Sequence, residues 1–282
     1  MRKHNHKGRS RLVRRHTLPV RLAHWLNVVC LLLLLMSGLQ IFNAHPHLYW
    51  GIAGANSDQA FFSVDSQQKE GVLQGYIHLG QYQLNTTGVL GASLDEQGEM
   101  VERAFPYWIT LPGWQDLGEG RHWHFLAGWL LVLNGIFYLS YGFWHRHIQQ
   151  DLLPVRQQLM PKYLWYEVVA HMKLRFPQGE EARRYNALQK IAYLLVIFIL
   201  LPIMIMTGLT MSPAMDAAFP FLPDIFGGRS SARSLHFITA TLLILFTVLH
   251  IAMVLLSGVG NNLRSMITGY YAIESEGNKD EK

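Results

Sequence analysis

Cysteine and charge are both scarce in this chain of 282 residues. Cys30 is the single cysteine, so no disulfide bond can form within the chain. Charged residues make up 15% of the sequence and hydrophobic residues 50%. That balance is typical of membrane proteins and excludes an ordinary soluble domain. The net charge is +5, but the basic residues lie beside apolar runs, where they mark membrane topology; we therefore expect no nucleic-acid partner.

Acidic residues are absent from four long apolar runs, at about residues 19–42, 122–144, 187–209 and 233–257. Each run is long enough to cross the hydrocarbon core of a bilayer as a helix. The sequence therefore predicts an all-α membrane protein, folded as a single domain (1–282) built on a four-helix transmembrane bundle. Membrane lipid is then its immediate surroundings.

Lysine and arginine are unevenly distributed among the polar segments. Residues 1–21 and 145–186 are rich in them, whereas the long segment 43–121 has only Lys69, Arg103 and Arg121. By the positive-inside rule, both termini and the 145–186 loop are cytoplasmic, and the 43–121 loop is extracytoplasmic. Within that loop, the stretch 95–98 (Asp-Glu-Gln-Gly) predicts a β-hairpin turn.

The first apolar run also has the form of a signal peptide, because a basic segment precedes it. Against cleavage, the run contains His24, Trp25 and Asn27 and ends without a clear small-residue cleavage site. We therefore interpret it as a retained transmembrane helix.

Two histidines interrupt the fourth run, His236 and His250. Fourteen residues correspond to about four helical turns, which places both imidazoles on nearly one face and roughly 21 Å apart. An imidazole in hydrocarbon is costly without a partner, and haem iron is a common partner for such a residue. A simpler explanation is a pair of histidines hydrogen-bonded between helices.

The direction of each run sorts four histidines by depth. His24 and His250 fall near the cytoplasmic side, and His124 and His236 near the outer side. Each pair could supply two axial imidazoles to one haem iron. No CxxCH motif for covalent attachment is present, so haem would be held by ligation and packing alone. We predict these four residues as the ligands of two haems.

Neighbouring residues refine this prediction. His122 competes with His124, but Arg121-His122-Trp123-His124-Phe125 matches Arg233-Ser234-Leu235-His236-Phe237 and so favours His124. Arg21, Arg121 and Arg233 each precede a predicted ligand by three residues, one turn nearer water, where they could pair with haem propionates. Ordinary snorkelling of arginine at the membrane surface explains the same spacing.

A short internal repeat accompanies the histidines. The first run ends in MSGL at 36–39 and the third in MTGL at 206–209. The repeat suggests two similar helical hairpins. The simpler explanation is that small residues allow close packing of membrane helices.

The chain resembles the bacterial cytochrome b561-type subunits of nickel-iron hydrogenases, formate dehydrogenases and thiosulfate reductases over about residues 15–270. The motifs that carry the resemblance are RLAHWLN, RHWHFLAGW with NGIFY, and ARSLHF followed by FTVLHI. The resemblance implies a four-helix bundle in the bacterial inner membrane with two b-type haems. His24 and His250 would bind the inner haem, and His124 and His236 the outer one.

The same resemblance implies electron transfer between the quinone pool and a periplasmic catalytic partner. NALQK at 186–190 and TGLTMSP at 207–213 are most similar to the thiosulfate-reductase-like or hydrogenase-like branch. A molybdopterin oxidoreductase or a hydrogenase-like subunit is therefore the expected partner. The long 43–121 loop departs from the short pattern of the family and leaves the docking face open.

Two other functions fit parts of the sequence. One is a stand-alone cytochrome b561-type oxidoreductase that acts directly at its outer haem. The other is a haemless membrane anchor or metal transporter, although a transporter is expected to have acidic residues or broken helices at mid-membrane. An absorption spectrum separates the haemless case from the others, and co-purification of a periplasmic subunit separates the remaining two.

Overall fold

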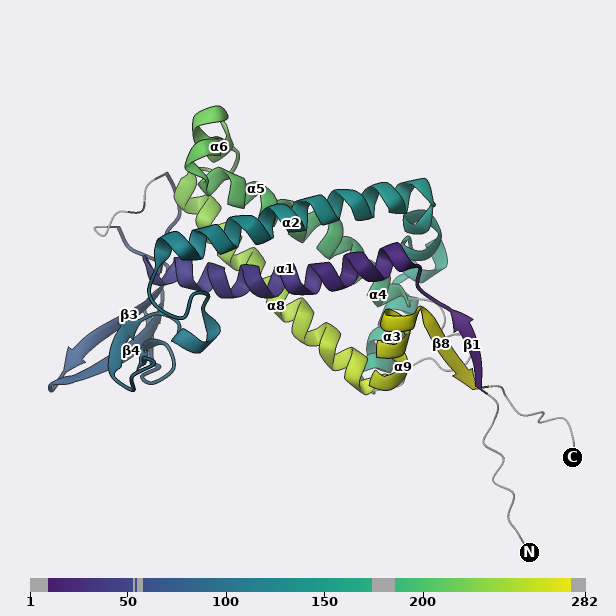
Figure 1. The fold of residues 1–282 in the computed structure, drawn as a ribbon, viewed down its shortest axis with the longest axis horizontal. Coiled ribbons are helices and arrows are strands. Elements are labelled where there is room, and N and C mark those ends of the chain that lie inside the picture. Colours follow the sequence, from purple (N-terminus) through teal and green to yellow (C-terminus); the bar gives the residue numbers. More distant parts are fainter. Residues whose placement is uncertain (1–9, 53, 55–57, 174–185, 275–282) are drawn as a thin grey trace, which may run out of the picture. The chain divides into compact units, whose positions relative to one another are not determined.

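The computed structural model describes residues 10–52, 54, 58–173 and 186–274 (Figure 1). The chain forms two compact units. Unit 1 comprises Met1–Trp25, Gly135–Ile199 and Leu243–Lys282, and unit 2 comprises Leu26–Asn134 and Leu200–Leu242. Each long helix contributes residues to both units, so each unit holds a part of every one of these helices.

Four helices are long and apolar enough to cross a membrane: α1 (Leu18–Asn43), α2 (Leu117–Trp144), the helix Ala187–Met211, and α8 (Arg229–Leu256). They contain the four apolar runs almost completely, so the prediction of four membrane-spanning helices agrees with the structure. The prediction of an all-α protein is wrong in part: the chain is mostly helical, but strands form between α1 and α2 and between the segments 10–14 and 270–274. Helix α2 begins five residues earlier than expected, because the Asp116 carboxylate accepts a hydrogen bond from the backbone N–H of Glu119 at 2.9 Å. A capping carboxylate satisfies one of the free donors of the first turn.

The third of these helices is not uniform. It consists of α4 (Ala187–Leu195), a π-helical turn η5 (Val196–Leu200) and α5 (Leu201–Met211). Pro202 lies in the first turn of α5 and lacks the N–H that a continuous helix needs. A π-turn absorbs this local mismatch without ending the helix.

The rest of unit 1 consists of short elements around the helix ends. Strand β1 (Ser10–Arg14) pairs antiparallel with β8 (Tyr270–Glu274), with Ser10 opposite Glu274 and Arg14 opposite Tyr270 (Figure 1). The remaining elements of the unit are η2 (Ile148–Leu152), η3 (Arg156–Leu159), α3 (Pro161–Met172) and α9 (Val259–Thr268).

Several basic residues that predicted the topology lie outside the described residues. They are Arg2, Lys3, Lys7, Arg9, Arg175, Arg183 and Arg184. Within the described part of the chain, Arg156, Lys162 and Lys173 belong to the segment after α2, on or next to η3 and α3.

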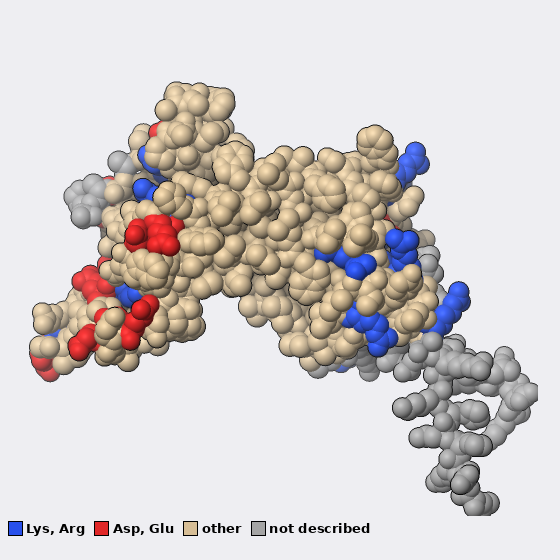
Figure 2. Space-filling model, in the orientation of Figure 1, with Lys and Arg blue, Asp and Glu red and all other residues tan. Residues whose placement is uncertain are grey.

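Unit 2 contains a β-rich segment between α1 and α2. A four-stranded antiparallel sheet has the order β2 (His47–Leu48), β3 (Phe62–Lys69), β4 (Val72–Leu79) and β5 (Tyr82–Asn85). Strands β6 (Gly91–Leu94) and β7 (Met100–Arg103) form a hairpin whose turn is at 95–99, so the predicted turn is confirmed. Acidic side chains gather over this segment (Figure 2). Short helices η1 (Tyr107–Ile109), α6 (Pro213–Ala218) and α7 (Leu222–Ile225) complete the unit.

The β-rich segment is fastened to the helix ends by a small apolar core. Phe42 of α1, Leu48 and Val64 are buried together, and Phe237 of α8 packs against them. The rings of Phe42 and Phe237 are 4.9 Å apart between centroids. Burial of side chains of this size stabilises by about 1.5–3 kcal/mol each. This core fixes the ends of α1 and α8 near the residues that form the candidate site of unit 2.

Candidate functional site

His124 of α2 and His236 of α8 face each other in unit 2. Their ring centroids are 6.2 Å apart and the ring planes are inclined at 58°. Each ring lies against a hydroxyl group of another helix: His124 against Ser37 of α1, and His236 against Thr207 of α5. Hydrogen bonds between helices, the simpler explanation considered for these histidines, are therefore present at both rings, and haem ligation by this pair stays a prediction.

His24 of α1 and His250 of α8 form a second pair, in unit 1. Their ring centroids are 6.4 Å apart with an inclination of 56°, almost the same values as in the first pair. The four histidines are thus brought together in the combinations expected from the sequence. Their role as haem ligands stays a prediction.

The spacing of both pairs fits two imidazoles on opposite sides of one metal ion. Metal–imidazole bonds in proteins are about 2.0–2.1 Å long, and with a ring radius of about 1.1 Å two ligands would have centroids about 6.3 Å apart. The observed separations of 6.2 and 6.4 Å are of this size. Among the described residues, no group of three or more His, Cys, Asp or Glu side chains could hold a metal ion. The donors at each site are paired imidazoles, a set that suits a haem iron.

A hydroxyl group lies against each ligand histidine of unit 2. Ser37 Oγ of α1 is 3.1 Å from Nδ1 of His124, and Thr207 Oγ1 of α5 is 3.0 Å from Nδ1 of His236. Both hydroxyl residues are fully buried. Because the contact uses Nδ1, Nε2 of each ring remains for a ligand.

A glycine follows each hydroxyl residue and lets the imidazole approach the helix. A Cβ atom at Gly38 would lie 3.3 Å from Cε1 of His124, and one at Gly208 would lie 3.3 Å from Cε1 of His236. That distance is tighter than an ordinary carbon–carbon contact. The MSGL and MTGL repeats thus form the same packing site for a histidine ring twice. We call each site a histidine seat: Ser37 and Gly38 for His124, and Thr207 and Gly208 for His236.

The histidines of unit 1 have a different environment. His250 stacks on Phe246 with centroids 5.9 Å apart, and Tyr193 of α4 meets it edge-on at 6.5 Å. Trp25 packs edge-on against His24 at 5.3 Å. Nδ1 of His24 is buried and has no hydrogen-bond partner among the described residues. A buried nitrogen without a partner is costly, so the surroundings of His24 differ in this respect from those of His124 and His236.

Two of the three predicted arginines contact backbone carbonyl groups. Arg21 donates to the carbonyl oxygens of Met266 and Ile267, and Arg233 donates to that of His45. Arg121 is exposed. A guanidinium group has five N–H donors, so these contacts use only part of its capacity. Their pairing with propionates stays a prediction.

Several other histidines lie away from the two pairs, and some of them contact other protein groups. His122 is exposed on α2, next to the seat that His124 occupies. His145 stacks on Tyr141 with centroids 4.3 Å apart. His147 and His47 form contacts of 2.7 and 2.8 Å with Asp151 and Asp65, respectively.

The sequence contains a signal for Ser37 and Thr207 that the explanation by helix packing does not use. Both precede the glycine of the repeated MSGL and MTGL motifs, and we attributed the small residues to helix packing. A hydroxyl at the same place in two motifs, each partnered by an RxxHF histidine, would have pointed to a histidine contact. Tyr193 and Phe246 had a weaker signal, since Phe246 lies one helical turn before His250.

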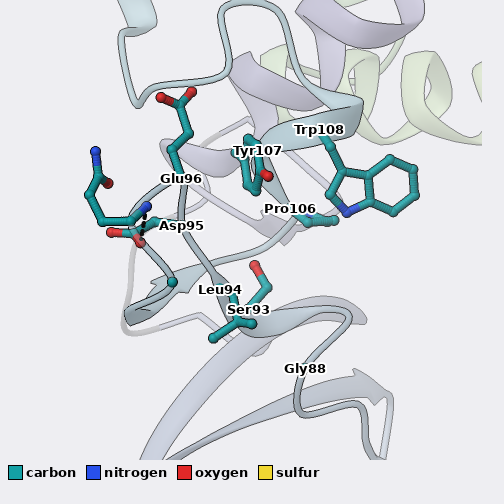
Figure 3. A pocket seen from close by; sticks show the side chains of 10 residues that line it. Gly88, Ser93, Leu94, Asp95, Glu96, Pro106, Tyr107 and Trp108 are labelled. Atoms are coloured by element: carbon teal, nitrogen blue, oxygen red, sulfur yellow. Dashed lines mark hydrogen bonds between the residues drawn. The ribbon is translucent and has the colours of Figure 1, made fainter.

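A pocket in unit 2 lies apart from the histidine pairs. It encloses about 520 Å³ and is lined by ten residues of the β6–β7 hairpin and its surroundings, among them Ser93, Asp95, Glu96 and Trp108 (Figure 3). It contains no histidine, so it offers a haem iron no imidazole ligand.

Comparison with known proteins identifies the family of this chain. Residues 15–269 match the family described as prokaryotic cytochrome b561. A curated relative from Azospira oryzae, "Putative protein-methionine-sulfoxide reductase subunit YedZ1", is 28% identical over 251 residues, which covers 89% of this chain and 94% of the relative. No solved structure matches the chain. Because the family match spans nearly all of its length, the chain belongs to the prokaryotic cytochrome b561 family and is a multi-pass membrane b-type cytochrome of bacterial electron transport.

Proposed function

We propose that this protein is a di-haem membrane subunit that transfers electrons between the quinone pool and an extracytoplasmic catalytic partner. The observation that carries the proposal is the presence of two histidine pairs with nearly equal spacing, 6.2 and 6.4 Å, one in each unit. In this assignment His24 and His250 hold one b-type haem, and His124 and His236 hold the other. When bound, each haem supplies a one-electron carrier.

The residues of the chain would set the conditions for that transfer. Helix packing supplies a low-dielectric surrounding, and the four imidazoles supply neutral axial ligands. Arg21, Arg121 and Arg233 would neutralise propionate groups. Both termini would be cytoplasmic, which places the pair of unit 1 at the cytoplasmic side and the pair of unit 2 at the outer side.

Proton-carrying groups near the end of α2 support a quinone reaction at unit 1. His147 Nδ1 is 2.7 Å from the carboxylate of Asp151, and its ring meets Tyr138 edge-on with centroids 6.3 Å apart. Asp151 is exposed, whereas Tyr138 lies within the membrane-spanning length of α2. Quinone reduction consumes protons as well as electrons, and groups that connect water to the membrane can deliver them.

The name of the Azospira relative supports a catalytic partner. That protein is named as a subunit of a putative methionine-sulfoxide reductase, and the match covers 94% of it. We therefore propose that this chain also serves a separate catalytic subunit. A molybdopterin oxidoreductase or a hydrogenase-like enzyme is the class that the sequence motifs favour.

The haem content of purified variants tests the assignment. We expect two haems per wild-type chain by pyridine haemochrome, and one in His250→Ala, because that substitution removes a ligand of unit 1 only. His122→Ala is the matched control on α2 and keeps both haems. A His250→Ala protein with two haems, or loss of a haem in His122→Ala, would contradict the assignment.

Electron exchange with quinone is tested separately. A short-chain quinol mixed with the oxidised wild-type protein should reduce the haems on the time scale of a stopped-flow absorption measurement. His147→Gln and Asp151→Asn should slow that reduction, whereas His145→Gln, at a residue that stacks on Tyr141, should not. Wild-type protein that binds two haems but is never reduced by quinol would remove the quinone from the proposal.

A further inference from the structure

We infer that Ser37 and Thr207 are positioning residues whose hydroxyl oxygens accept hydrogen bonds from His124 and His236, and that these bonds lower the reduction potential of the haem bound by that pair. The inference rests on the proposed function, because it requires a haem between the two histidines.

The direction of each hydrogen bond follows from where the hydroxyl proton goes. Ser37 Oγ is 2.6 Å from the carbonyl oxygen of Leu33, one turn earlier in α1, and Thr207 Oγ1 is 2.7 Å from that of Ile203. A carbonyl oxygen only accepts, so the single hydroxyl proton is donated to it. The hydroxyl oxygen then has only lone pairs to offer to the imidazole.

Nδ1 of each histidine must therefore carry a proton. His124 Nδ1 is 3.1 Å from Ser37 Oγ, and His236 Nδ1 is 3.0 Å from Thr207 Oγ1. The backbone carbonyl groups of Leu34 and Met204 are also within hydrogen-bonding range of the two rings, and they too can only accept. Both arrangements select the tautomer with hydrogen on Nδ1.

This tautomer leaves the lone pair on Nε2, the nitrogen that can bind iron. A ligand histidine commonly donates its other ring N–H to an acceptor, which fixes the ring orientation and makes the ligand more basic. A more basic imidazole stabilises the oxidised iron relative to the reduced iron. Hydrogen bonds at the second nitrogen are thus one of the levers by which a protein lowers a haem potential.

The two hydroxyl contacts belong to the same local arrangement, which occurs twice in the structure. Each hydroxyl residue is followed by a glycine that admits the ring at 3.3 Å, and each is on a different helix from the histidine it contacts. Ser37 and Thr207 have no exposed surface, so water does not compete for the bond. Nδ1 of His24, by contrast, has no partner among the described residues.

The test compares variants that lose the hydroxyl group with variants that keep it. Ser37→Ala and Thr207→Val remove the acceptor while keeping a similar volume, and Ser37→Thr and Thr207→Ser keep it. Potentials of both haems are measured by optical redox titration of the full-length holoprotein. We expect Ser37→Ala and Thr207→Val each to raise the reduction potential of the unit 2 haem by about 18–59 mV. For a one-electron couple this corresponds to a two- to tenfold change in the equilibrium constant for reduction.

The conservative exchanges serve as rescues, and the haem of unit 1 is an internal control. Ser37→Thr and Thr207→Ser should restore the wild-type potential, and the other haem should not shift in any variant. A purely structural role predicts instead a loss of haem or stability without a selective potential change. Variants that bind two haems with wild-type potentials would overturn the inference.

Failure of the inference can be told apart from failure of the proposed function. If wild-type protein binds no haem, or if His124→Ala and His236→Ala leave both haems in place, the ligand assignment is wrong. If those two variants each lose one haem while Ser37→Ala and Thr207→Val titrate as wild type does, only the role of the hydroxyl groups is wrong.

Discussion

His16 is the titratable residue outside the spans whose burial has the clearest consequence. It is 8% exposed, and burial, assisted by the neighbouring Arg15 cation, lowers its pKa from 6.5 to about 4. The folded protein therefore binds this proton less readily than the unfolded chain does. Stability is full above pH 6.5 and falls as the pH drops from 6.5 towards 4, by on the order of 3 kcal/mol.

His16→Gln should remove this part of the pH dependence. Thermal unfolding midpoints of the two proteins in detergent, measured at pH 7.5 and pH 5, give the comparison. We expect the unfolding midpoint of the wild type to fall more between pH 7.5 and pH 5 than that of the variant. Equal losses would show that other groups cause the acid sensitivity.

Gly38 and Gly208 are predicted to be intolerant of a side chain. The new Cβ would crowd Cε1 of the adjacent histidine at 3.3 Å, and overpacking of this kind costs about 1–3 kcal/mol. Gly38→Ala and Gly208→Ala should therefore retain less haem after purification. Gly128→Ala is the control on α2, since its nearest neighbour, Leu34 Cδ2, is 3.9 Å away. Equal haem content in all three variants would contradict the seat described for the histidines.

At the scale of elements, α4 depends on the cap at its beginning. The side chain of Asn186 accepts a hydrogen bond from the backbone of Gln189 at 2.8 Å, and its amide nitrogen is 3.0 Å from Nε2 of His171 in α3. Asn186→Ala removes both contacts and should cost about 1 kcal/mol. A lower thermal midpoint, with both haems still bound, is the expected result; haem loss would show that the cap also supports the site.

The helices could be predicted from the sequence, whereas much of the β-rich segment could not. Four long apolar runs without acidic residues leave little choice but membrane helices, so their approximate positions follow from hydropathy. Strand β3 reads Phe-Ser-Val-Asp-Ser-Gln-Gln-Lys, a mostly polar string whose pairing with β4 depends on tertiary contacts. The turn at 95–99 was predictable because Asp95 and Gly98 are turn residues with a local mechanism.

The histidine pairs were also predictable, but their surroundings were not. Helix direction and depth suffice to match His24 with His250 and His124 with His236. The contact of Ser37 with His124 depends on the rotation of α1 about its own axis, which hydropathy does not define for a helix surrounded by lipid. The contacts of Tyr193 and Arg233 depend in the same way on packing between distant segments.

At the scale of the whole molecule, charge is divided between segments. Residues 43–121 contain nine acidic and three basic residues, a formal charge of −6, whereas the remaining chain has 21 basic and 10 acidic residues. Acidic side chains appear over the β-rich segment of unit 2 and basic side chains over residues of unit 1 (Figure 2). The imbalance agrees with an extracytoplasmic 43–121 segment under the positive-inside rule.

Cysteine labelling would test this orientation. Cys30 is buried and is the single cysteine, so Cys30→Ala gives a background for Gln97→Cys in the β6–β7 turn and Gln150→Cys in η2, both at exposed positions. A membrane-impermeant maleimide added to spheroplasts should label the first and reach the second only after permeabilisation. The reverse pattern would invert the topology.

The pairing of β1 with β8 has a consequence for biogenesis. Residues 10–14 leave the ribosome first, yet their partner strand, 270–274, is made after every helix. Strand β1 therefore stays unpaired until residues 270–274 have been made, and the two strands must then lie in the same compartment. Closure of this two-stranded sheet therefore follows the synthesis of every helix, and a chain that stops before residue 270 would leave β1 as an open edge.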